Sequence, residues 1–118
     1  MSTLFAMYVV LGFVLMLVAL PLLFGKVPPN PLYGFRLRPA TDDPAIWYPT
    51  NRHSARWLIA GGLSTVVVAI GLRLVPGIRL DAYALGCLAV FSVVLLAGLV
   101  QTIRFMNALA RQKEQGPR

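Results

Sequence analysis

The residues of this chain that could do chemistry are concentrated between positions 28 and 57, in the stretch PPNPLYGFRLRPATDDPAIWYPTNRHSARW. Acid–base or nucleophilic catalysis needs a titratable or nucleophilic group within hydrogen-bond reach of its target. The candidates are Asp42, Asp43, His53 and Ser54. The two aspartates are also typical of a helix start, and His53 is typical of a polar side chain at a membrane interface. We therefore predict no enzymatic activity and assign no catalytic residue.

Metal and phosphate-loop chemistry have no supporting pattern. The single His and the single Cys, His53 and Cys87, are too far apart in the chain for a zinc motif, and Cys87 lies within an apolar run. Neither standard glycine-rich phosphate loop is present. We predict no cofactor and no metal ligand.

Arginines form the most distinctive charged set in this stretch. Arg52 and Arg56 are four residues apart and share one face of a predicted helix. Together with Arg36 and Arg38 they could form an anion-binding pocket at the headgroup level, for a lipid phosphate or a peptide carboxylate. Alternatively, they serve only to set topology and anchor the chain to lipid.

A second face of the same predicted helix carries Trp47, Asn51 and Ala55 at four-residue spacing. An aromatic ring, an amide and a small residue could dock against the extended part of the stretch. A structural role in folding the loop and a role in a ligand site both remain open from sequence.

Composition indicates the environment of these residues. The chain has 118 residues, of which 58% are hydrophobic and 13% charged, and its mean hydropathy is +0.72. Soluble domains carry about 25% charged residues, so we expect an integral membrane protein. The net charge of +7 would also suit nucleic acid. We predict no nucleic-acid binding, because the basic residues flank apolar runs, as the positive-inside rule describes.

Three apolar runs predict three transmembrane helices, at about residues 4–24, 52–72 and 82–103. A helix of about 20 residues crosses a hydrocarbon core of ~30 Å. The first run is interpreted as a retained span and not a signal peptide, because no Lys or Arg precedes Lys26 and Pro28-Pro29 follows. The prediction is one all-α membrane domain over residues 1–118, with a structured cytoplasmic loop at about 25–51 and a polar tail at 104–118.

Prolines predict details of the helix boundaries. Pro21 should kink or loosen the end of the first span. The sequence Thr41-Asp42-Asp43-Pro44 is typical of a helix start. Pro49 either ends that short turn or opens a second helix, and we favour one continuous helix from Thr50 to Leu72. Residues 32–37 are expected to be extended.

The second predicted span and the residues before it also contain side chains that could contact the membrane interface or another helix. Trp47 and Trp57 fit the aromatic belt at a membrane interface. The pairs Ala60/Ser64 and Gly61/Thr65 have the small-xxx-small spacing that permits close helix contact.

The distribution of Lys and Arg predicts the orientation of the spans. Nine of these residues belong to the side that holds the loop and the tail, and two belong to the other side. By the positive-inside rule, the chain is expected in the cell membrane with its N-terminus outside, and with the loop and the C-terminus in the cytoplasm.

The polar stretch resembles the SdpI family of small bacterial membrane proteins, which the three-span layout also matches. That family's signature is N-x-x-x-G-[IFV]-R-[TL] after a first span, followed by W-x-x-x-[NH]-R leading into the next. Here the matching segments are Asn30-Pro-Leu-Tyr-Gly34-Phe-Arg36, Pro39-Ala-Thr41, Trp47-Tyr48 and Asn51-Arg52. The motif residues that the resemblance singles out are Asn30, Gly34, Arg36, Trp47, Asn51 and Arg52. The chain departs from the pattern at Pro49, inside the helix that joins Trp to Asn-Arg, and at Ala55, where Gly is common.

The resemblance implies a function that composition and spacing alone do not. The founding member is an immunity protein against a secreted membrane-active peptide, and it also holds a repressor at the membrane. We therefore expect resistance to, or sensing of, such a peptide through residues 30–56. The alternatives are a small accessory or scaffold subunit of a larger membrane complex, and a lipid- or peptide-processing enzyme. The expected partners are the lipid bilayer, a peptide toxin or another membrane protein, and a second copy of the chain.

Overall fold

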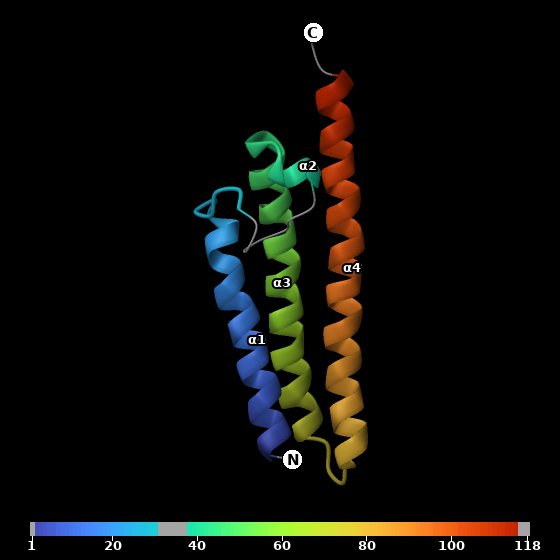
Figure 1. The fold of residues 1–118 in the computed structure, drawn as a ribbon. Helices are drawn as coiled ribbons and strands as arrows, with labels where there is room; N and C mark the ends of the chain where they lie inside the picture. Colours follow the sequence, from blue (N-terminus) through green and yellow to red (C-terminus); the bar gives the residue numbers. More distant parts are fainter. Residues whose placement is uncertain (1, 31–37, 116–118) are drawn as a thin grey trace.

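Three long helices and one short helix make up the protein in the computed structural model, which describes residues 2–30 and 38–115. They are α1 (Ser2–Leu23), α2 (Arg38–Thr41), α3 (Pro44–Arg73) and α4 (Leu80–Gln115). In Figure 1, α3 lies between α1 and α4 and contacts both. The described residues contain no strand, and each long helix is long and apolar enough to cross a membrane. The predicted all-α fold with three spans is confirmed.

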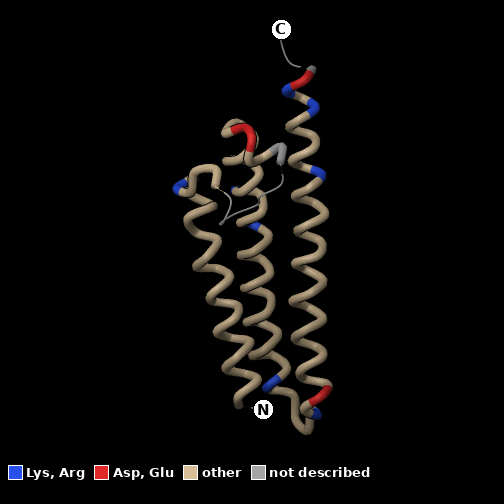
Figure 2. The backbone as a smooth tube through the Cα atoms, viewed as in Figure 1, with Lys and Arg blue, Asp and Glu red and all other residues tan. Residues whose placement is uncertain are grey.

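The charged residues lie near the two ends of this bundle. The molecule is 64 Å long, about twice the ~30 Å of a hydrocarbon core, so both ends extend beyond the membrane interior. Figure 2 shows Lys and Arg near both ends and an uncharged middle. Residues 24–30, α2, the start of α3 and the C-terminal part of α4 lie at one end, here called the insert end. The N-terminus and the α3–α4 turn lie at the other.

The end of α1 is closed by backbone hydrogen bonds around a glycine. Gly25 has φ +67° and its N–H donates to the Leu22 carbonyl at 3.3 Å. The Lys26 N–H donates to the Pro21 carbonyl at 2.9 Å. This is the Schellman pattern, which satisfies the last carbonyls of a helix. Pro21 lies within α1.

The start of α3 confirms one proline prediction and corrects another. Asp43 is the N-cap, its Oδ1 accepting from the Ala45 N–H at 3.0 Å, and Pro44 follows in the first turn. The prediction that Pro49 separates two helices was wrong, because α3 runs through it without interruption. Pro49 lacks the N–H that would bond to the Ala45 carbonyl. Since Ala45 is exposed in the first turn, water can satisfy that carbonyl, and the cost is small.

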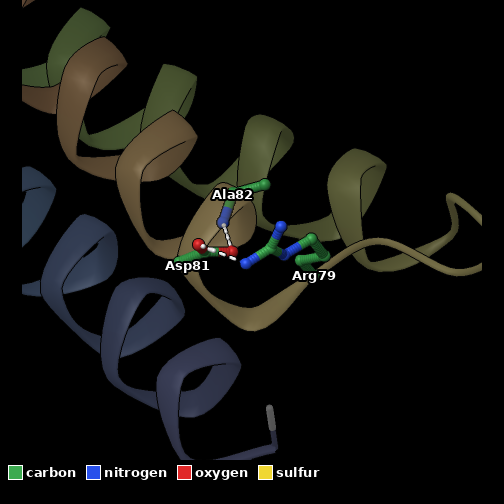
Figure 3. A network of polar contacts seen from close by, with 3 residues as sticks. All are labelled: Arg79, Asp81 and Ala82. Carbon is green, nitrogen blue, oxygen red and sulfur yellow. Dashed lines mark hydrogen bonds and ion pairs between the residues drawn. The ribbon is translucent and has the colours of Figure 1, made fainter.

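The beginning and end of α4 also differ from the span predicted at 82–103. Before it, Arg79 forms an ion pair with Asp81 at 3.2 Å, and Asp81 Oδ1 accepts from the Ala82 N–H at 2.8 Å (Figure 3). A carboxylate is favourable at a helix N-terminus. At the other end α4 continues to Gln115, so most of the tail expected at 104–118 is helical.

Small residues allow the helices to pack closely. A Cβ on Gly62 would lie 2.4 Å from the Gly12 carbonyl oxygen, so α1 and α3 are in backbone contact there. Gly98 of α4 lies close to Trp57 of α3, where an added Cβ would be 2.7 Å from the Trp57 Cβ. Of the predicted small-residue pairs, Gly61 and Thr65 are buried.

Two tyrosines join the three helices at the end opposite the insert. The Tyr83 hydroxyl donates to the Ala69 carbonyl at 2.9 Å, which connects α4 to α3. The Tyr8 hydroxyl donates to the Ala84 carbonyl at 3.1 Å, which connects α1 to α4. Buried hydroxyls need such partners in a medium without water. The helix ends are therefore fixed relative to one another.

Candidate functional site

Trp47 is the centre of the insert end. Its side chain is fully buried, together with Ala40 of α2, Ile46 of α3 and Met106 of α4. Its indole N–H donates to the Val27 carbonyl at 2.7 Å. One side chain thus connects the α1–α3 connection, α2, α3 and α4. The prediction that Trp47 belongs to a lipid-facing aromatic belt was wrong, because its indole N–H finds its partner inside the protein.

Asn51 and Ala55 continue the face that Trp47 begins, as the four-residue spacing predicted. Asn51 is 1% exposed, and its amide donates to the Trp47 carbonyl at 2.9 Å. Ala55 is fully buried against Ala19 and Leu22 of α1. The face therefore packs against the end of α1 and the residues that follow it.

Arg52 reaches across to the end of α1. Its Nε donates to the Leu23 carbonyl at 3.3 Å. A cation at a helix C-terminus is favourable, because the last carbonyls carry partial negative charge. Arg52 and Arg56 are both exposed. The predicted four-arginine pocket includes Arg36, which lies outside the described residues.

The remaining motif residues lie in the connection between α1 and α2. The Asn30 amide donates to the Pro28 carbonyl at 2.8 Å and the residue is half-buried. Gly34 and Arg36 lie outside the described residues, as do residues 32–37, which were expected to be extended. The structure thus brings Trp47, Asn51 and Arg52 together around the end of α1.

Two polar contacts and one ring stack at this end were not foreseen from the sequence. His53 Nδ1 lies 3.1 Å from the Thr102 hydroxyl, and its ring stacks on Phe105 with centroids 4.5 Å apart. Lys113 forms an ion pair with Asp43. In each case the partner lies on α4, about 50 residues or more along the chain. No local pattern could have identified these pairs.

Thr50 was also not singled out by the sequence. It is fully buried, and its hydroxyl has no hydrogen-bond partner among the residues that the structure describes. A buried unsatisfied polar group costs about 1–3 kcal/mol.

Two of the four residues considered for catalysis, Asp43 and His53, have structural contacts. Asp43 caps α3 and pairs with Lys113, and His53 contacts Thr102 and Phe105. Within residues 2–30 and 38–115, no group of three His, Cys, Asp or Glu side chains could hold a metal ion. The arrangement is suited to holding a polar segment in a fixed shape at one face of a membrane.

Comparison with known proteins adds one finding to this geometry. The model of the SdpI/YfhL protein family matches residues 26–103. The match begins just after α1 and includes α2, all of α3 and the membrane-crossing part of α4. No curated protein and no solved structure matches the chain. Because the family match covers well over half of the sequence and includes Trp47, Asn51 and Arg52, the chain belongs to the SdpI/YfhL protein family.

Proposed function

We propose that this chain is a non-enzymatic membrane protein of the SdpI type, which confers resistance to a membrane-active peptide, or senses it, through residues 30–56. Family membership supports the class of function. One structural observation supports the location: Trp47 and Arg52 hold the first turns of α3 to the backbone at the end of α1. A recognition surface must be held in shape by its own packing and hydrogen bonds.

In this proposal the motif residues have different tasks. Trp47 and Asn51 are buried and set the shape of the segment. Arg52 and Arg56 are exposed on α3 and face the ligand. A guanidinium pairs with a carboxylate through two parallel hydrogen bonds, so the carboxyl terminus or an acidic side chain of a peptide is a suitable partner.

The proposed orientation places this surface on the cytoplasmic face, where nine of the eleven Lys and Arg residues belong. A peptide arriving from outside must then enter or cross the bilayer before it meets Arg52 and Arg56. We therefore propose that protection acts on peptide already inserted in the membrane, and not by capture at the outer surface.

Gene deletion tests this function. Cells lacking the gene should survive less well when exposed to membrane-active peptides from related strains, and the wild-type chain should restore survival. A chain carrying Arg52→Ala and Arg56→Ala should restore it poorly. Arg79→Ala is the matched control, because Arg79 is an exposed arginine at the opposite end. Unchanged survival and unchanged transcription in the deletion strain, across a broad peptide panel, would overturn the proposal.

The accessory-subunit alternative was motivated by the small-residue spacings. In the structure one of the two pairs is used within the chain: Gly61 and Thr65 are buried, and Gly61 faces Leu95 of α4. Of the other pair, Ala60 is exposed, so only the Ala60/Ser64 spacing is left to support an external partner. Affinity purification in mild detergent separates the two proposals, since recovery of the chain alone, or of its homo-oligomer, would count against a subunit role.

The enzyme alternative has its own test. Asp42→Asn, Asp43→Asn and His53→Gln remove the titratable groups among the residues considered for catalysis, while keeping similar side-chain volumes. If these variants protect cells as well as the wild type does, a lipid- or peptide-processing activity at this site is excluded.

A further inference from the structure

A shallow groove lies on the side of α4 at the insert end, next to the surface described above. It has a volume of about 800 Å³ and is lined by His53 of α3 and by residues 101–114 of α4. Most of this α4 segment lies beyond the family match, which ends at residue 103. The charged residues that line the groove are Arg104, Arg111 and Glu114.

The two arginines of this groove are available to a ligand. Arg104 and Arg111 are seven residues apart, which is about two turns, so they lie on the same side of α4. Both are exposed, and within the described parts of the chain neither guanidinium forms a hydrogen bond or an ion pair. Glu114 offsets one of the two charges. A guanidinium fork matches the oxygens of a phosphate group.

The base of the groove is held in place by contacts with α3. The His53 ring stacks nearly parallel on Phe105, at an interplanar angle of 10°. His53 Nδ1 also contacts the Thr102 hydroxyl, which is buried between the helices. A groove with fixed walls costs less entropy to fill than one that must be ordered by its ligand.

The position of the groove along α4 corresponds to the lipid headgroups. The segment from residue 80 to 103 is about 36 Å long at 1.5 Å per residue, which is enough to cross ~30 Å of hydrocarbon. Arg104 therefore lies where the helix leaves the membrane interior, and Arg111 lies about 10 Å further out.

A second, smaller groove continues in the direction of the membrane interior. It has a volume of about 180 Å³ and is lined by Arg56, Trp57 and Ala60 of α3. These three residues follow His53 at i+3, i+4 and i+7. The four side chains therefore lie on one face of α3. This side of α3 and α4 thus has a basic groove at the headgroup level. Closer to the membrane interior it has a second groove, which is bordered by the Trp57 ring and the Ala60 methyl group.

We propose that this side of α3 and α4 binds one anionic phospholipid. Its phosphate contacts Arg104, its headgroup extends towards Arg111, and one acyl chain lies along Trp57 and Ala60. Basic pockets between transmembrane helices bind such headgroups. The apolar lower groove favours a lipid over a soluble phosphate, which would use only the upper part. The proposal does not depend on the immunity function.

Lipid retention tests this site directly. The full chain is purified in micelles that contain equal amounts of phosphatidylglycerol and phosphatidylcholine, and native mass spectrometry identifies the retained lipid. The wild type should prefer phosphatidylglycerol. Replacing Arg104 and Arg111 by Gln should lower that preference about fivefold per residue, which corresponds to about 1 kcal/mol per charge near a membrane surface. Replacement of both by Lys keeps the two charges and removes the guanidinium fork, so it should preserve only part of the preference.

Two further variants separate specific binding from general charge and from misfolding. Arg79→Gln removes an exposed arginine at the opposite end and should leave the preference unchanged. Ala60→Trp fills the lower groove on an exposed face of α3, and should reduce retention although both arginines remain. Circular dichroism of each variant should show unchanged helix content.

Three results would overturn the proposal. The first is equal retention of the two lipids by the wild type. The second is an unchanged preference when Arg104 and Arg111 are both Gln. The third is a rise in unfolding temperature with inorganic phosphate alone that equals the rise with phosphatidylglycerol, because the ligand would then be a soluble phosphate.

Discussion

At the scale of single residues, buried polar side chains hold the insert end together. Trp47 and Asn51 are each buried and each donates a hydrogen bond to a backbone carbonyl. A hydrogen bond between such groups contributes little net energy, but an unpaired group in the same place costs about 1–3 kcal/mol. The motif residues are therefore sensitive to substitutions that keep their size and remove their polarity.

Trp47→Phe is expected to destabilise the protein by about 1–3 kcal/mol, because the Val27 carbonyl loses its donor while an aromatic ring remains. The free energy of unfolding in mixed detergent micelles measures the effect. Trp57→Phe is the matched control, since no hydrogen bond from Trp57 is formed within residues 2–30 and 38–115. An equal loss for the two variants would show that the indole N–H of Trp47 is unimportant.

At the scale of the helices, close packing depends on individual glycines. Gly12 and Gly62 place the backbones of α1 and α3 in contact, and the Trp57 side chain of α3 packs against Gly98 of α4. Membrane helices gain little from burying apolar surface, because lipid is equally apolar, so van der Waals packing contributes much of their association. Glycines that face another helix should therefore matter, and glycines that face lipid should not.

Gly62→Ala is expected to destabilise the bundle by about 1–3 kcal/mol, because the added methyl group must push α1 away from α3. Gly71→Ala, in the same helix, is the control: an added Cβ there meets nothing within 4 Å. It should be neutral or stabilise by up to about 1 kcal/mol, since Ala favours helix more than Gly does. Unfolding in mixed micelles compares the two, and similar losses would contradict the packing argument.

The junction between the start of α3 and the end of α4 combines a helix cap with an ion pair. Asp43→Asn keeps a good N-cap and removes the ion pair with Lys113, so it should cost less than 1 kcal/mol. Asp43→Ala removes both and should cost about 1 kcal/mol more. Hydrogen exchange at the amides of residues 45–47 reports the difference. Equal exchange in the two variants would mean that the side-chain cap does not stabilise α3.

At the scale of the whole molecule, the two ends have different constructions. The end opposite the insert is joined by the two tyrosine hydrogen bonds and carries the exposed Arg79–Asp81 pair. The insert end has α2, the capped start of α3 and the long continuation of α4. The protein therefore has a short turn on one side of the membrane and a folded polar structure on the other side.

The orientation of the chain is expected to place the insert end in the cytoplasm, because most of the basic residues belong to it. In a Cys87→Ser background, Asp42→Cys should react with a membrane-impermeant thiol reagent only after cells are permeabilised. Arg79→Cys should react in intact cells. Both positions are exposed, so the reverse pattern would overturn the orientation.

The sequence by itself determined the parts of this protein that depend on local composition. Apolar runs long enough to cross a membrane fixed the three spans, and the Asp43-Pro44 pair fixed the start of α3. The shared face of Trp47, Asn51 and Ala55 followed from helical periodicity. These features could be predicted because each depends on residues within a few turns of one another.

Only the tertiary structure decided how those parts meet. Pro49 lies within one continuous helix, and Trp47 is buried, although it was also expected in the aromatic belt of the membrane interface. The contacts of Trp47 with Val27, of His53 with Thr102 and of Lys113 with Asp43 join segments far apart in the chain. Whether a polar side chain faces lipid, solvent or another backbone depends on which helices are adjacent. That adjacency arises from the packing of all three helices together and has no local pattern in the sequence.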